Sequence, residues 1–163
     1  MWMLKARQAF AGIVLASAIG CTSASAGVEI TQRCNFWEAF RGTLDGQTAA
    51  GVTTKMSDGS LVSVIVTSED ISLRLSGRHW DLETGDDARI RIVVDGNGFR
   101  GKAHAVNDQE FEVSNLPNDF LESLIDGREA YIEINGVRWR LNLNGLTRCL
   151  KSSVEPYARR RNR

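Results

Sequence analysis

Residues 137–143 read VRWRLNL and directly follow the dipeptide Asn135-Gly136. Apolar and polar side chains alternate along this stretch, which is the period of a β-strand with one buried face. Asn-Gly favours a tight two-residue hairpin, because both central residues of that turn need a positive φ. Residues 129–135 form a second strand-like stretch of similar length before the turn. This part of the chain is therefore predicted to be an antiparallel hairpin.

The same period extends outward over most of the chain. Asp58-Gly59 and 95–98 (DGNG) provide turns between further segments rich in Val, Ile, Leu and Thr. Strands with one apolar face are typical of antiparallel sheets. We predict a mainly β fold, a single antiparallel β-barrel or a two-sheet sandwich. The eight predicted strands are 48–56, 61–68, 71–76, 88–95, 99–106, 110–114, 129–135 and 137–143.

Two segments depart from the strand period. Residues 117–126 are predicted to form one short helix, with Pro117 in the first turn and Gly127 at the stop. A short C-terminal helix is predicted from about Leu146, ending at Pro156. Residues 34–40 fit either a strand or a helical turn, so the conformation of 27–43 stays open. The apolar residues of the first helix are Phe120, Leu121, Leu124 and Ile125.

The first 26 residues are predicted to be a secretory signal peptide. Lys5 and Arg7 precede an apolar run over 9–19, and Ala24-Ser25-Ala26 fits an A-x-A cleavage site. The alternative is lipidation at Cys21, since 18–21 (AIGC) is similar to a lipobox. The prediction is an exported protein with a signal peptide over 1–26, a β-rich domain over 27–155 and a disordered basic tail over 156–163.

Composition and charge narrow the classes of protein. The chain has 163 residues with 20 basic and 20 acidic side chains, which is too polar for a membrane channel and suits one globular domain. Without 1–26 the net charge is −2, and without the tail arginines it is −6. The tail could bind an anionic membrane surface, or it could be a solubilising end; nucleic acid is not an expected partner. These arginines are Arg159, Arg160, Arg161 and Arg163.

Cys34 and Cys149 are the cysteines left after removal of 1–26. In an oxidising compartment, two cysteines outside any Cys-x-x-Cys or Cys/His cluster are predicted to form a disulfide. The bond would close a loop of about 115 residues.

Catalytic and metal-binding motifs are not found in the sequence. The only histidines, His79 and His104, have no metal-ligand spacing, and no nucleophile or phosphate-loop motif accompanies them. We therefore predict no catalytic residue, no metal and no cofactor. The loop with His79, Trp80 and Asp81 is the predicted contact surface, since Trp80 could pack over one end of the fold or stack on a ligand.

Several short motifs resemble a group of small uncharacterised exported proteins of alphaproteobacteria. Residues 75–85 (LSGRHWDLETG) are similar to the first block of that group, and 93–96 (VVDG) to a strand ending in its turn. A short helix and 141–145 (LNLNG) before Cys149 resemble the remainder, over about 61–149. The resemblance implies a periplasmic location and a β-rich fold, and it implies no activity.

These observations favour a non-enzymatic periplasmic binding or interaction domain, possible partners being a protein or an envelope component. One alternative is a carrier that holds a small apolar ligand inside the barrel, with Trp80 at the mouth. The other is an enzyme that uses His79 with nearby carboxylates.

Overall fold

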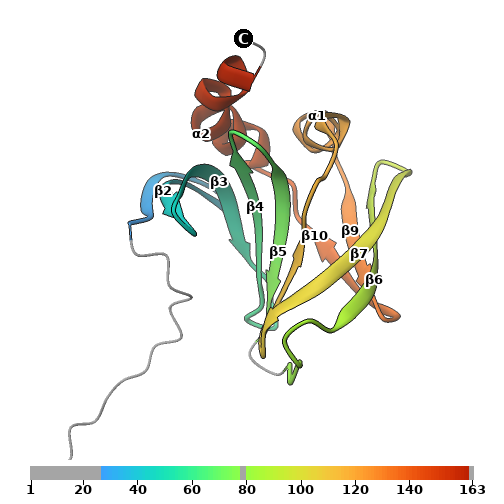
Figure 1. The fold of residues 1–163 in the computed structure, drawn as a ribbon. Coiled ribbons are helices and arrows are strands. Elements are labelled where there is room, and N and C mark those ends of the chain that lie inside the picture. Colours follow the sequence, from blue (N-terminus) through green and yellow to red (C-terminus); the bar gives the residue numbers. More distant parts are fainter. Residues whose placement is uncertain (1–26, 78–79, 162–163) are drawn as a thin grey trace, which may run out of the picture.

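Ten strands and two helices make up the protein in the computed structural model, which describes residues 27–77 and 80–161 (Figure 1). All eight predicted strands are confirmed, with ends that agree to within two residues. The strands are β1 Glu29–Cys34, β2 Trp37–Leu44, β3 Gln47–Lys55, β4 Leu61–Thr67, β5 Ile71–Ser76, β6 Asp87–Val94, β7 Asn97–Asn107, β8 Glu110–Val113, β9 Ala130–Ile134 and β10 Val137–Leu141; the helices are α1 Asn118–Asp126 and α2 Leu146–Arg161.

The strands form a single antiparallel sheet in the order β1-β2-β3-β4-β5-β8-β7-β6-β9-β10. The mainly β, antiparallel fold is therefore confirmed. In the described part of the chain no backbone pairing joins β1 to β10, so the sheet is open, and neither a closed barrel nor a two-sheet sandwich is confirmed. The segment left open in the sequence, 27–43, contains β1 and most of β2.

The hairpin turns have the predicted geometry. Asn135 and Gly136 have φ values of 49° and 80°, the left-handed pair of a two-residue turn, and Val137 pairs with Ile134 directly beside it. Asp95-Gly96 forms the same turn between β6 and β7, and Asp45-Gly46 forms it between β2 and β3. Three hairpins thus have registers fixed by their turn residues.

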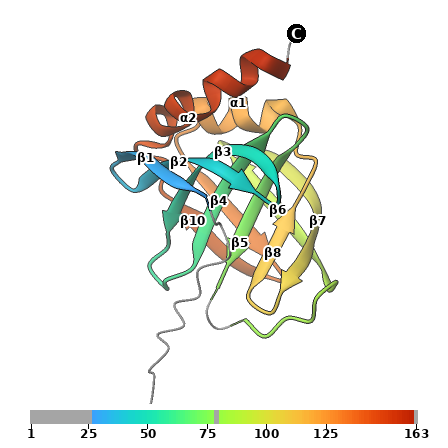
Figure 2. The same ribbon diagram turned by 60° about the vertical axis from the view of Figure 1, so that its left-hand side comes forward.

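The main core lies on the inner face of the coiled sheet. The two helices cover one end of it, and the segment after β5 lies at the opposite end (Figures 1 and 2). Side chains from β2, α1 and α2 enter this core and are almost fully buried. The largest of them are Trp37, Phe120, Leu124, Leu146 and Leu150.

A second, small core lies on the opposite face of the sheet. It contains Phe40 on β2, Ala49 on β3 and Ile65 on β4, with Val28 and Leu44 packed against it. Trp37 faces the main core, so β2 buries residues on both of its faces.

A cluster of ion pairs covers the outer face of β5 and β8 and includes Asp45 from the turn between β2 and β3. Arg74 Nε lies 2.8 Å from Glu112 Oε2 and 3.7 Å from Glu110 Oε1, and its Nη2 lies 2.6 Å from Asp45 Oδ2. Burial lowers the pKa of Arg74, but the hydrogen bond to Asp45 and the charges of Glu112 and Glu110 outweigh burial and raise that pKa above its usual value.

Replacing Arg74 with methionine is expected to lower the free energy of unfolding by about 2 kcal/mol, because the poorly exposed Glu112 loses its close counter-ion and Glu110 loses one of its interactions. Glu110 is 7% exposed and Glu112 19% exposed. The matched control is Arg33→Met, whose pair with Glu38 is on the surface and should contribute about 0–1 kcal/mol. Urea denaturation measures both; equal effects of the two variants would contradict the burial argument.

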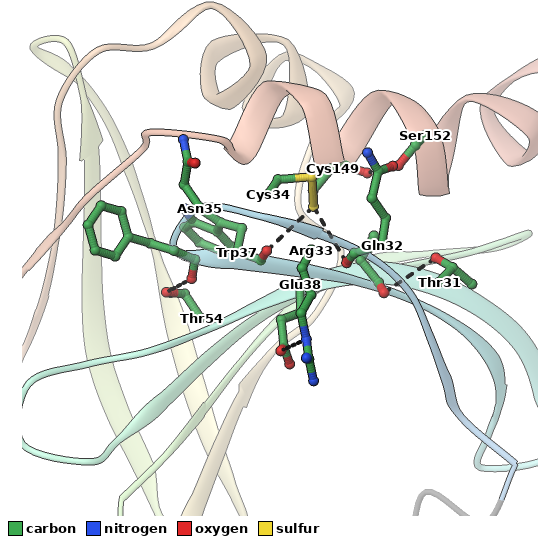
Figure 3. The surroundings of a disulfide bond; sticks show 12 residues. Thr31, Gln32, Arg33, Cys34, Asn35, Trp37, Glu38, Thr54, Cys149 and Ser152 are labelled. Carbon is green, nitrogen blue, oxygen red and sulfur yellow. Dashed lines mark hydrogen bonds and ion pairs between the residues drawn. A yellow bond between two sulfur atoms is a disulfide. The ribbon is translucent and has the colours of Figure 1, made fainter.

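Side chains bridge the two ends of the open sheet. Trp37 Nε1 donates to the Asn142 carbonyl at 2.7 Å, and Trp139 Nε1 donates to Asp58 Oδ2 at 3.3 Å. The predicted disulfide between Cys34 and Cys149 is present, with its Cα atoms 5.8 Å apart, and it joins the end of β1 to α2 (Figure 3). The two ends are therefore held together by indole hydrogen bonds and one covalent bond.

The approach of these two ends requires a glycine at position 145. Gly145 has a φ of +90°, and a Cβ there would lie 2.0 Å from the Cys34 carbonyl oxygen. No other residue fits this position without moving the backbone.

The predicted end of the C-terminal helix is wrong. The helix α2 continues past Pro156 to Arg161, so residues 156–161 are helical rather than disordered. Proline has no N–H, which leaves the Ser152 carbonyl without its donor within the helix. Arg41 Nη2 donates to that carbonyl from β2. This bond replaces the missing one, and the helix continues. The side chains of the tail arginines lie outside the described part of the structure.

Candidate functional site

The predicted contact loop lies at the end of the sheet opposite the helices. His79 is outside the described residues, and Asp81 is exposed. The Trp80 ring lies 5.5 Å from the Phe111 ring and 5.8 Å from the Trp139 ring, and it packs against the main core. Trp80 therefore closes this end of the core and is not a free stacking platform.

Asp58 borders this aromatic cluster. Its Oδ1 accepts the Ser60 N–H at 2.9 Å, and its Oδ2 accepts the Trp139 indole. The backbone hydrogen bond from Ser60 is the main cause that holds the pKa of Asp58 below its usual value. The carboxylate is thus ionised at neutral pH and serves the turn after β3.

A different surface gathers positive charge. We call it the basic face: the outward side of β6, β7 and β10, with β9 lying between β6 and β10, opposite the core-facing residues of these strands. Its six basic side chains are all exposed. Residues 27–158 contain 14 basic and 20 acidic residues, so this face holds six of the 14 basic residues of an acidic domain. The members of the basic face are Arg89, Arg91, Arg100, Lys102, Arg138 and Arg140.

Sheet register places like charges opposite one another on this face. Arg91 on β6 is paired with Arg100 on β7, and Arg89 is paired with Lys102. Like charges directly opposite on one face of an antiparallel pair destabilise the sheet. The four cations form a block two strands wide and two positions long, and on its other side Arg91 is paired with Glu133 of β9.

Some cations of the basic face have acidic partners. Arg138 Nη2 lies 2.9 Å from Glu133 Oε2, Arg140 pairs with Glu129, and Lys102 lies 4.0 Å from Asp87. The guanidinium of Arg138 also lies 4.3 Å from the centre of the Tyr131 ring.

The remaining three cations are different. Arg89, Arg91 and Arg100 have no ion pair or hydrogen bond with any residue that the structure describes. They line one hollow of about 540 Å³ on the surface of β6 and β7. The other polar residues at this hollow are Asp87, Glu133 and Asn135. Guanidinium groups with unused donors are well suited to bind phosphate or carboxylate oxygens.

In the described ranges 27–77 and 80–161, no group of three or more His, Cys, Asp or Glu side chains could hold a metal ion. His104 Nδ1 contacts Asp87 Oδ1 on the exposed face of β6 and β7. No helix within those ranges is long and apolar enough to cross a bilayer.

The basic face was not among the sites predicted from the sequence, although its residues form a visible pattern there. The polar positions of the alternating stretches RIRI (89–92) and RWR (138–140) are all arginine. Those of RGK (100–102) are arginine and lysine. Alternation alone predicts the strands, whereas the sign of the charge at the polar positions marks this face.

Comparison of the chain with protein-family models, with curated proteins and with solved structures finds no match.

Proposed function

We propose that this protein is a non-enzymatic periplasmic binding domain whose basic face holds it against an anionic surface of the cell envelope. The observation that carries the proposal is the set of three unpaired guanidinium groups, Arg89, Arg91 and Arg100, around one hollow. Residues 27–158 contain more acidic than basic residues, and six of the 14 basic ones lie on the basic face.

The repulsion between the opposed cations of β6 and β7 supports a role in binding an anion. Opposed cations on β6 and β7 repel each other in the free protein, and an anion between them would remove that repulsion. Arginine favours such contacts because its planar fork binds two oxygens at once. Long-range attraction between the face and a negative surface would also steer the encounter.

The proposed location rests on separate observations. The Cys34–Cys149 disulfide fits an oxidising compartment. The signal peptide predicted over 1–26 and the resemblance to exported proteins favour the periplasm. The tail arginines, Arg159–Arg161 and Arg163, would add a second contact to the same surface.

The protein is expected to co-sediment with vesicles of phosphatidylglycerol and phosphatidylcholine, and to dissociate as salt is raised. The variant R89S/R91S/R100S should bind about 100-fold more weakly, because each basic residue near an anionic surface contributes about 1 kcal/mol. A chain truncated after Ala158 measures the share of the tail.

The control variant is R33S/K55S/K151S, which removes the same charge from exposed sites on β1, β3 and α2. If the control and the basic-face variant lose equal affinity, net charge alone explains binding and the proposed site is wrong. Binding to vesicles of pure phosphatidylcholine would also contradict the proposal.

A further inference from the structure

The hollow on the basic face contains more than cations. Three guanidinium groups are accompanied by two carboxylates, Asp87 and Glu133, and by the amide of Asn135. Its volume of about 540 Å³ lies within the usual range of small-molecule sites, about 300–1,000 Å³, and exceeds the space that one phosphate group needs. The site therefore has room for a ligand with further polar groups.

The arginines fix where an anionic group would bind. Arg91 and Arg100 are cross-strand partners, and Arg89 lies two residues along β6, which is about 7 Å in a strand. Arginine side chains are long enough to converge on one tetrahedral anion from these positions. The unpaired state of all three leaves their donors available for it.

The carboxylates show what the rest of the ligand must carry. Both Arg138 hydrogen bonds to Glu133 end on Oε2, at 2.9 and 3.3 Å, so Oε1 can accept another donor. Asp87 lies two residues before Arg89 on the same face. Carboxylates repel further phosphate groups, whereas they accept hydrogen bonds from hydroxyls.

From this juxtaposition we infer that the hollow binds a phosphate ester of a polyol, with the phosphate on Arg89, Arg91 and Arg100 and the hydroxyls on Glu133, Asp87 and Asn135. This inference rests on the proposed function and adds the chemical class of the ligand. The same chemistry occurs in a free glycerol phosphate and in the headgroup of a phosphoglycerol lipid.

The test is a titration of the full mature chain, with its disulfide formed, followed by amide chemical shifts in NMR spectra. The probes are glycerol 3-phosphate, inorganic phosphate and glycerol, each at constant ionic strength. Glycerol 3-phosphate is expected to bind about tenfold more tightly than inorganic phosphate. The variant R89S/R91S/R100S should lose saturable binding of both anions.

The variant D87A/E133A provides the decisive comparison. Removal of two negative charges should leave the affinity for inorganic phosphate equal or higher, while the tenfold preference for the ester disappears. A preference that persists in this variant, or equal affinities of the two anions in the unaltered protein, would overturn the inference. The vesicle experiment is independent of these outcomes, so the proposed function can hold where the inference fails.

Competition identifies the source of the ligand. Displacement of the protein from phosphatidylglycerol vesicles by glycerol 3-phosphate means that the hollow takes the lipid headgroup. Saturable binding without displacement means that it takes a soluble ester beside the membrane contact. Each result supports the site, and each assigns a different source.

Discussion

The double variant C34A/C149A is expected to unfold with a free energy about 4–5 kcal/mol lower than that of the oxidised protein. The disulfide closes a loop with a sequence separation of 115 residues, and the loss of chain entropy in the unfolded state is large for a loop of this length. Urea denaturation followed by tryptophan fluorescence measures the difference. Reductant should lower the stability of the unaltered protein by a similar amount and leave the variant unchanged.

The location of the bond adds a second expectation. Since the disulfide ties α2 to β1, hydrogen exchange in the variant should accelerate first in these two elements. Uniform acceleration over the whole sheet would contradict this local effect, and an unchanged denaturation midpoint would show that the packing of α2 alone holds the ends together.

The substitution Trp37→Ala is expected to lower the free energy of unfolding by about 3–5 kcal/mol, the usual range for a large aromatic residue removed from a core. Trp37 is fully buried, and its indole donates to the Asn142 carbonyl across the gap between the ends of the sheet. The substitution removes packing and a bridge at once. Thermal and urea denaturation both report the loss.

Two further variants separate these contributions. Trp37→Phe keeps most of the ring packing and removes the hydrogen bond, which should account for about 1–2 kcal/mol. Phe36→Ala is the neighbouring control, because Phe36 is 58% exposed and should contribute little. A Trp37→Phe variant as stable as the unaltered protein would mean that the indole bridge contributes nothing.

Most of the sheet could be predicted from the sequence, because β3 to β10 contain alternating apolar and polar stretches and are separated by recognisable turns, although β3 and β4 also bury residues of the small core. The strand β2 could not be predicted, since Trp37 faces the main core and Phe40 the small one, which breaks the alternation. The same kind of turn follows β2, at Asp45-Gly46. Because no strand could be recognised before it, this turn did not predict a hairpin.

The length of α2 shows a different limit. Proline normally ends a helix, and the sequence near Pro156 contains nothing that contradicts this rule. The donor that satisfies the Ser152 carbonyl is Arg41, which is 111 residues away in the chain. Long-range contacts of this kind become visible only when the fold is known.

Four of the six cations of the basic face could be placed from the sequence. A two-residue turn at Asp95-Gly96 places Arg91 opposite Arg100 by counting outward along both strands, as the structure shows. The neighbour on the other side was not accessible, since Glu133 lies beside Arg91 only because β9 pairs with β6. The cationic block is thus a local feature, whereas the carboxylate at its edge depends on sheet order.

The separation between the two bridged cysteines also has a consequence for biogenesis. On the export route that we propose, β1 would cross the membrane first, and the thiol of Cys34 would stay unpaired until almost the whole domain had followed it. Cys149 is the only other cysteine in 27–163, so no incorrect intramolecular pairing can form in the meantime. Oxidation would then act as the last step of assembly, and appearance of the disulfide would report that the complete domain has crossed the membrane.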